Sequence, residues 1–214
     1  TRCDAFHFLR ADRIGSRSPR GQDDVVHGQP RNADSPEDHG VGGGSSTDPC
    51  NDTYRGPSAR SEPEIAGHTA FINAHTFKTW NSYHSVAGMV LFPWGYTTAH
   101  TPDDALFRTI AAQMASQNGY SIGQAPELLY TVNGGSCDWG YGATTEHAKI
   151  FSFTTEVGGS DFWPLPAERD GLIAENLASD IYLCRIAGAY LALNSLVVTG
   201  GDGSGATFPV SRGP

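Results

Sequence analysis

The sequence predicts an α/β fold with a mixed β-sheet flanked by helices, because short apolar runs alternate with helical patterns between residues 45 and 195. The chain of 214 residues is long enough for one domain with a substantial core. The amino-acid composition of the two ends of the chain differs from that of the domain. Residues 1–44 mix Arg, Asp, Ser, Pro and Gly without apolar periodicity, which predicts an irregular, disordered or non-native segment. Residues 196–214 are predicted to form a Gly-rich tail or linker.

The first predicted helix lies in "SEPEIAGHTAFINAHTFKT", residues 61–79. Ser61 and Glu64 have the spacing of a capping box, and Pro63 stands in the first turn, where its missing N–H is tolerated. Helical spacing then relates four further side chains: Ile65, His68, Ile72 and His75.

Two more helices follow. The segment "TPDDALFRTIAAQMASQNG", residues 101–119, is predicted to begin with Thr101 as N-cap and Pro102 as its first residue, and to stop at Gly119. Its apolar face consists of Leu106, Ile110 and Met114. The last helix begins near Glu168, and its apolar stripe consists of Ile173, Leu177, Ile181 and Cys184.

Three apolar runs between the helices predict strands. They are "GMVLFP" at 88–93, "LLYTV" at 128–132 and "KIFSFTTE" at 149–156. The last run alternates Phe with Ser and Thr, which predicts one buried and one polar face.

Charge and cysteine content restrict the function classes. A net charge of −9 and a pI near 5.2 argue against nucleic acid or an anionic membrane as partner, and no stretch of 18 apolar residues predicts a membrane span. The absence of C-x-x-C spacing excludes a zinc knuckle and a thioredoxin-type motif. Four cysteines permit one or two disulfides in any of three connectivities: Cys3, Cys50, Cys137 and Cys184.

Three residues at strand ends are candidates for chemistry. Glu156 terminates a predicted strand, Tyr130 runs into the Gly-rich loop "NGGSCDWGYG", and His84 stands shortly before the strand "GMVLFP". Because ligands gather at the carboxyl ends of strands in α/β sheets, this grouping suits metal-assisted hydrolysis. The His would hold the metal, the Glu would activate water and the Tyr would donate a hydrogen bond. Taken singly, each residue type is more often structural at such positions.

Four segments between Gly42 and Ala187 resemble, in order, the second half of the catalytic domain of carboxypeptidase A-like zinc metallopeptidases. They are "GGGSSTDPCNDTYRGPSARSEPE", "SYHSVAGMVLFPWGYT", "LLYTVNGGSCDWGYG" and "KIFSFTTE". The resemblance implies that residues 45–195 form the C-terminal half of such a domain, without its N-terminal part.

The resemblance also implies a role for four residues. His84 matches a ligand of the single catalytic Zn²⁺, and Glu156 matches the general base that takes a proton from zinc-bound water. Tyr130 matches the tyrosine that closes over the bound substrate. Cys137 falls at the floor of the specificity pocket, where a neutral side chain argues against a preference for Lys or Arg.

The implied function is hydrolysis of the C-terminal residues of peptides or proteins by a secreted, monomeric enzyme. The first twenty residues are Arg-rich and lack the apolar stretch of a secretory signal, so we expect either a removed leader or an incomplete chain.

The sequence departs from the family pattern at two places. None of the eight histidines is followed three residues later by Glu, so the family's His-x-x-Glu zinc motif is missing. The Asn-Arg pair that binds the substrate's carboxylate is missing too, and Arg31 in "PRN" is the only loose candidate for it. The leading interpretation is therefore a zinc carboxypeptidase represented by an incomplete chain. The alternatives are a non-catalytic peptide-binding pseudo-carboxypeptidase and an inactive fragment.

Overall fold

The computed structural model describes residues 44–51 and 54–197. Our predictions for 1–44 (except Gly44) and for most of 196–214 fall outside these residues. Residues 196 and 197 belong to the last helix rather than to a tail. Cys137 and Cys184 are free thiols, whereas Cys50 is disulfide-bonded.

Four strands form one sheet in the order β1-β4-β2-β3. The strands are β1 (Thr79–Ser85), β2 (Met89–Phe92), β3 (Ser121–Gln124) and β4 (Phe151–Val157). β1 pairs with β4 and β2 with β3 in parallel, whereas β2 and β4 run antiparallel. The predicted mixed sheet is therefore confirmed.

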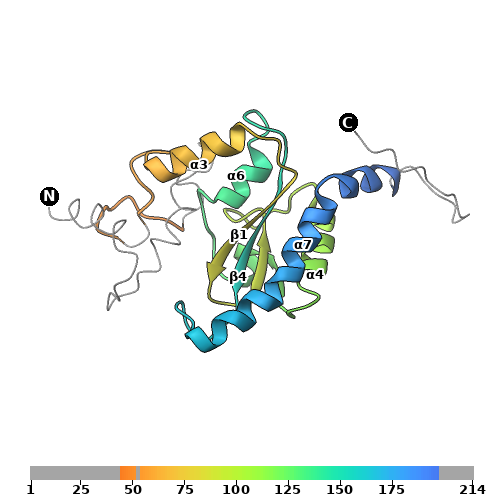
Figure 1. The fold of residues 1–214 in the computed structure, drawn as a ribbon. Helices are drawn as coiled ribbons and strands as arrows, with labels where there is room; N and C mark the ends of the chain where they lie inside the picture. Colours follow the sequence, from red (N-terminus) through yellow and green to blue (C-terminus); the bar gives the residue numbers. More distant parts are fainter. Residues whose placement is uncertain (1–43, 52–53, 198–214) are drawn as a thin grey trace, which may run out of the picture.

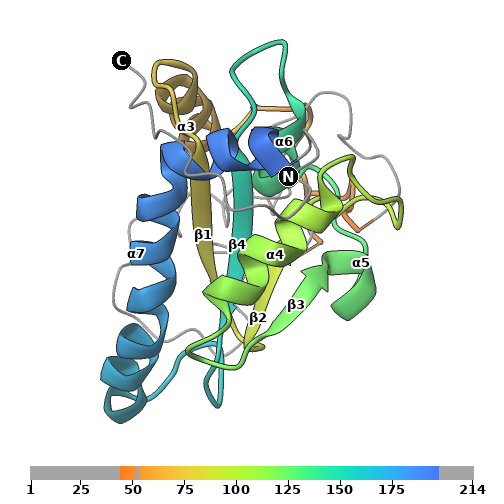
Figure 2. The ribbon, with the colours of Figure 1, turned by 90° about the vertical axis from the view of Figure 1, so that its right-hand side faces the viewer.

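Helices cover both faces of the sheet (Figures 1 and 2). α4 (Asp104–Met114) and α7 (Pro166–Val197) pack together on one face. α3 (Pro63–Asn73) and α6 (Ser136–Gly142) lie on the other, and the short α5 (Ala125–Leu128) follows β3 directly. No helix in the described part of the chain is both long and apolar enough to cross a membrane.

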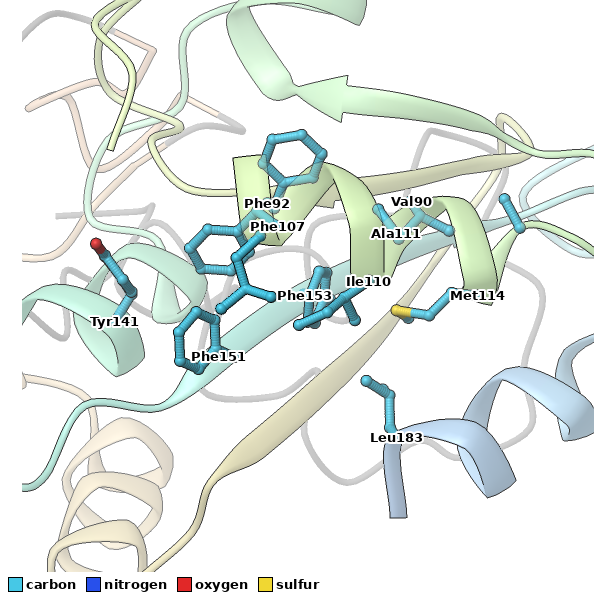
Figure 3. Packing of buried hydrophobic residues seen from close by; sticks show 12 residues of the cluster. Val90, Phe92, Phe107, Ile110, Ala111, Met114, Tyr141, Phe151, Phe153 and Leu183 are labelled. Carbon is cyan, nitrogen blue, oxygen red and sulfur yellow. The ribbon is translucent and has the colours of Figure 1, made fainter. Parts of the chain in front are cut away.

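The larger core lies between α4, α7 and the sheet (Figure 3). At its centre is Phe107, which is fully buried and stacks on Phe92 with a ring separation of 5.7 Å. Rings from β4 approach it at an edge or a tilt, which is the arrangement that aromatic pairs prefer. The predicted face of α4 is confirmed, because Leu106, Ile110 and Met114 are all buried.

A second core lies under α3 and α6, around the fully buried Trp139. The ring of Trp80, in β1, contacts the Trp139 ring edge-on. The Arg60 guanidinium group stacks over the Trp139 ring and forms an ion pair with Glu146 at 2.6 Å. With helices on both faces, β4 has two buried sides. The predicted polar face of that strand is therefore wrong for Ser152, which is fully buried against α6.

The starts of the first two predicted helices differ from the prediction. α3 begins at Pro63 with Glu62 as N-cap, and Ser61 donates to the Glu62 side chain instead of capping the helix. α4 begins at Asp104 because residues 101–103 form a turn whose Asp103 carboxylate is bound by Tyr141 and Lys149. The predicted capping box and the Thr101 cap are therefore wrong.

The predicted strand "LLYTV" is also wrong. The chain forms β3 over Ser121–Gln124, which we did not predict, and α5 then begins at Ala125 with Pro126 in its first turn. Residues 129–132 leave this turn as a loop without a strand partner. The loop lines the pocket described below.

The predicted stripe of α7 faces outward. Ile173, Leu177 and Ile181 are 61%, 55% and 41% exposed. The helix instead packs through Asn176, Ser179 and Leu183, all buried. Asn176 is satisfied by bonds to the Leu172 carbonyl and the Tyr120 hydroxyl, which is why a polar residue can occupy the inner side.

Two matched substitutions test this assignment of core and surface. Ile110→Val removes one methylene from a side chain that is 1% exposed, and should lower the free energy of unfolding by about 1 kcal/mol. Ile173→Val makes the same change at an exposed site and should have little effect. Urea denaturation measures both, and an equal loss from the two variants would contradict the packing of α4 and α7.

Candidate active site

The register of β1 and β4 brings His84 and Glu156 side by side. The two residues are paired positions near the carboxyl ends of parallel neighbouring strands. Their side chains are only 8% and 14% exposed, and His84 Nδ1 lies 3.9 Å from Glu156 Oε1. This is beyond hydrogen-bond distance, so the two groups share one site without a direct bond between these atoms.

Burial raises the pKa of Glu156 to about 7. Removal from water disfavours the ionised form of a carboxyl group, and this pushes its pKa upward. A carboxyl group that titrates near neutrality can both accept and release a proton there, as general acid–base chemistry requires.

His84 and Glu156 line a cavity of about 340 Å³. Tyr130 and Cys137 line the same cavity, so the structure brings together all four residues singled out from the sequence. Tyr130 is 55% exposed and comes from the loop after α5. The walls are mainly apolar: Val86, Leu91, Phe92, Leu129, Val132 and Phe162. Such a lining suits an uncharged side chain.

Cys137 is held by reciprocal bonds between α6 and β4. Its thiol donates to the Ser152 carbonyl at 3.1 Å, and the Ser152 hydroxyl donates to the Cys137 carbonyl at 2.6 Å. Burial raises the pKa of the Cys137 thiol, so the group stays protonated at neutral pH. It is therefore a small neutral surface of the cavity rather than a nucleophile.

Sequence reasoning missed Asp138, which also lines the cavity and is 4% exposed. Its carboxylate accepts from the Gly95 N–H at 2.9 Å and from the Tyr96 N–H at 3.2 Å. This ties the loop after β2 to α6. No pattern could have revealed it, because its partners are backbone groups more than 40 residues away in the chain.

A hydrogen-bond cluster fixes the chain just after Glu156. The Tyr120 hydroxyl accepts from the Gly158 N–H at 2.7 Å and from Asn176 Nδ2 at 3.1 Å, and it donates to the Glu175 carboxylate. These bonds link the end of β4 to α7. They hold the backbone two residues beyond the carboxyl group that faces the cavity.

The described residues fit only part of a zinc site. Within 44–51 and 54–197, no group of three or more His, Cys, Asp or Glu side chains is arranged to hold a metal ion. A catalytic zinc takes three protein ligands, and this part of the chain supplies one imidazole beside one carboxylate.

Comparison with known proteins identifies the family of this chain. The model of the zinc carboxypeptidase family matches residues 10–179, which is most of the chain. The chain belongs to the zinc carboxypeptidase family.

Relatives of this zinc carboxypeptidase chain include carboxypeptidase A2 of Mus musculus, 34% identical over 136 residues, and carboxypeptidase A1 of Bos taurus, 32% identical over 133 residues. The matches cover 60% and 59% of this chain but 32% and 31% of those proteins. The chain therefore spans about a third of the length of the curated relatives it matches.

Solved structures show the same partial likeness. Carboxypeptidase A from Helicoverpa armigera is 25% identical with a TM-score of 0.59, over 67% of this chain and 38% of that one. Bovine thrombin-activatable fibrinolysis inhibitor, in complex with tick carboxypeptidase inhibitor, has a TM-score of 0.64 over 85% of this chain and 61% of that one. At 23% identity, the second likeness supports the fold alone.

The Tyr120 cluster can be tested by removing one hydroxyl group. Tyr120→Phe leaves the partly buried Gly158 N–H without its acceptor and should lower the free energy of unfolding by about 1–3 kcal/mol. Hydrogen exchange of the Gly158 amide should accelerate. The control is Tyr83→Phe, which removes one exposed bond to Asp180 and should cost less. Unchanged Gly158 exchange in the Tyr120 variant would contradict the cluster's role.

Proposed function

We propose that this chain carries the C-terminal half of the catalytic domain of a zinc-dependent metallocarboxypeptidase, which hydrolyses the C-terminal residue of peptides or proteins. The observation that carries the proposal is the pairing of His84 and Glu156 at the ends of β1 and β4, inside a cavity that Tyr130 and Cys137 also line. Membership of the family supports the reaction class. We also propose that the protein is secreted and monomeric, which is supported by the resemblance to the family alone.

Glu156 is the proposed general base. It takes a proton from the attacking water and delivers it to the departing amine, so the carboxyl group ends the cycle as it began. Tyr130, on the exposed loop, donates a hydrogen bond to the bound peptide. The apolar walls and the neutral Cys137 thiol receive the side chain of the C-terminal residue, which favours uncharged side chains over Lys and Arg.

His84 is the proposed zinc ligand on this chain. Zinc, when bound in such sites, lowers the pKa of a coordinated water molecule and polarises the scissile carbonyl. The remaining ligands must come from outside the described residues, because those residues hold no group of three candidate ligands. The activity of this chain therefore depends on those additional ligands.

A second candidate function is peptide binding without turnover. It is favoured by a specific observation, the absence of His-x-x-Glu from all 214 residues. In such a protein, the cavity and Tyr130 would bind a peptide end, and Glu156 would have no zinc-bound water to act upon.

Zinc retention separates the two functions. After dialysis against a mild chelator, we expect about one zinc ion per chain by atomic emission if the proposed enzyme is correct. His84→Ala should weaken zinc binding by more than about 100-fold. Loss of a residue that only hydrogen-bonds to a metal ligand already costs about 10- to 100-fold in metal affinity, and loss of the ligand itself costs more. His75→Ala, which alters an exposed histidine just after the end of α3, is the control. Failure of the native chain to retain zinc would mean that His84 stands alone on this chain, which would leave peptide binding without turnover or an inactive fragment.

Replacement of the proposed base tests the chemical step. In the zinc-loaded protein, Glu156→Gln should reduce hydrolysis of benzoyl-Gly-Phe by about 10²–10⁴-fold with zinc content unchanged, since the amide cannot accept the proton. Glu64→Gln, an isosteric change at an exposed position of α3, should hydrolyse the peptide at the native rate. A Glu156 variant with native activity would remove Glu156 from the mechanism.

A further inference from the structure

A sequence motif for N-linked glycosylation begins at Asn51. Asp52 and Thr53 follow it, and an asparagine two residues before Ser or Thr, with any residue but Pro between them, can accept an N-linked glycan. No other asparagine in the 214 residues has Ser or Thr at that distance. Residues 52 and 53 lie outside the described ranges, and the motif requires only their identity in the sequence. A motif this short needs the support of a surface position and a suitable compartment.

The structure places Asn51 in an exposed turn before α3. The Asn51 N–H donates to the Asp48 carbonyl at 2.9 Å, and the Asn51 carbonyl accepts from the Tyr54 N–H at 3.0 Å. In the same turn, the Cys50 N–H donates to Asp48 Oδ1 at 2.9 Å. These bonds use only backbone atoms of Asn51, so a sugar on its side-chain nitrogen would leave them in place.

The residue directly before Asn51 indicates the compartment. Cys50 is disulfide-bonded. Disulfides form and persist in the secretory pathway and outside the cell, and they are rare in the cytosol. N-linked glycans belong to proteins of the same pathway. This support for secretion does not depend on the family resemblance.

Asn51 also lines an open, polar hollow of about 710 Å³. The other lining residues are Gly44, Ser45, Ser46, Thr47, Arg55 and Tyr130. The Arg55 Nη1 atom donates to the Ser45 hydroxyl at 3.4 Å, and the Arg55 N–H donates to the Ser46 carbonyl at 3.1 Å. Such a lining suits a sugar, because the hydroxyl groups of a sugar both donate and accept hydrogen bonds.

The hollow is held against the loop that carries Tyr130. Gly44 has a φ of +89°, and a Cβ atom there would lie 2.2 Å from the Thr131 carbonyl oxygen. Only glycine permits that approach. A glycan on Asn51 would therefore stand beside Tyr130, which is 55% exposed and also lines the cavity that contains Glu156.

We propose that Asn51 carries an N-linked glycan whose first sugar occupies the hollow beside Tyr130. The transfer forms a bond from Asn51 Nδ2 to the anomeric carbon of an oligosaccharide held on a lipid pyrophosphate. The bond between that carbon and the pyrophosphate oxygen breaks, the pyrophosphate leaves with the electron pair, and the amide nitrogen loses one proton. The modification rests on the secretion that the proposed function includes, and not on zinc or peptide hydrolysis.

The glycan is tested by expressing the full chain behind a cleavable secretory signal in cultured mammalian cells. Intact mass spectrometry should show the native chain heavier than its sequence by one glycan, and peptide N-glycosidase F should remove that mass. In heavy-oxygen water, the same enzyme should introduce a labelled carboxyl group at position 51 alone. Secreted and cell-retained protein are both measured, so a variant that folds poorly still gives a result.

Asn51→Gln and Thr53→Ala should both lose the glycan completely, since each removes one part of the motif. Thr53→Ser preserves the motif and should keep the glycan. The matched control is Asn73→Gln, which alters an exposed asparagine at the end of α3 outside any such motif and should keep the native mass shift.

Nitration by tetranitromethane tests the placement of the glycan. Tyr130 of the glycosylated native chain should react more slowly than Tyr130 of Thr53→Ala, which retains the Asn51 side chain without the glycan. Tyr83, which is 39% exposed on β1, should react at the same rate in both proteins.

A native chain without a glycan, or a glycan that survives Asn51→Gln, would overturn the proposal. Equal reaction of Tyr130 in the two proteins would overturn the placement in the hollow. Neither readout measures zinc or hydrolysis, so failure of the glycan site and failure of the proposed enzyme are distinguishable.

Discussion

The parallel register between β1 and β4 is the constraint on which the rest of the structure depends. It pairs His84 with Glu156 and, five residues earlier, Thr79 with Phe151. Because side chains alternate across a strand, a slip of one residue would turn Phe151 out of the aromatic core and Glu156 away from the cavity. The packing around Phe107 therefore fixes the position of the candidate base, and stability and function depend on one alignment.

Much of this arrangement could be predicted from the sequence. The fold class and the face of α4 follow from apolar periodicity, and Glu156 stands out because it lies near the end of an apolar strand. The strand that carries His84, β1, was not predicted, because its sequence TWNSYHS is mostly polar. The predictions failed where tertiary contacts override a local pattern. The run that begins at Leu128 has the residues of a strand but no partner strand, and α7 packs through Asn176 because Tyr120 satisfies its amide group. Long-range partners of this kind leave no trace in local spacing.

The described part of this chain supplies some components of a carboxypeptidase site and lacks others. It supplies an apolar cavity, a buried imidazole beside a carboxyl group and an exposed tyrosine. Its described residues do not supply a full set of zinc ligands. The chain spans about a third of the length of the curated relatives it matches.

Titration of the Glu156 carboxyl group by NMR tests the central claim most directly, with Glu156→Gln used to assign its signal. If Glu156 is enclosed beside His84 as the β1–β4 register requires, its pKa will be raised to about 7. The group would then be largely protonated below that pH and ionised above it. A midpoint near the ordinary value of about 4.3 would mean that Glu156 faces water. That result would contradict the enclosed site and, with it, the arrangement on which the proposed function rests.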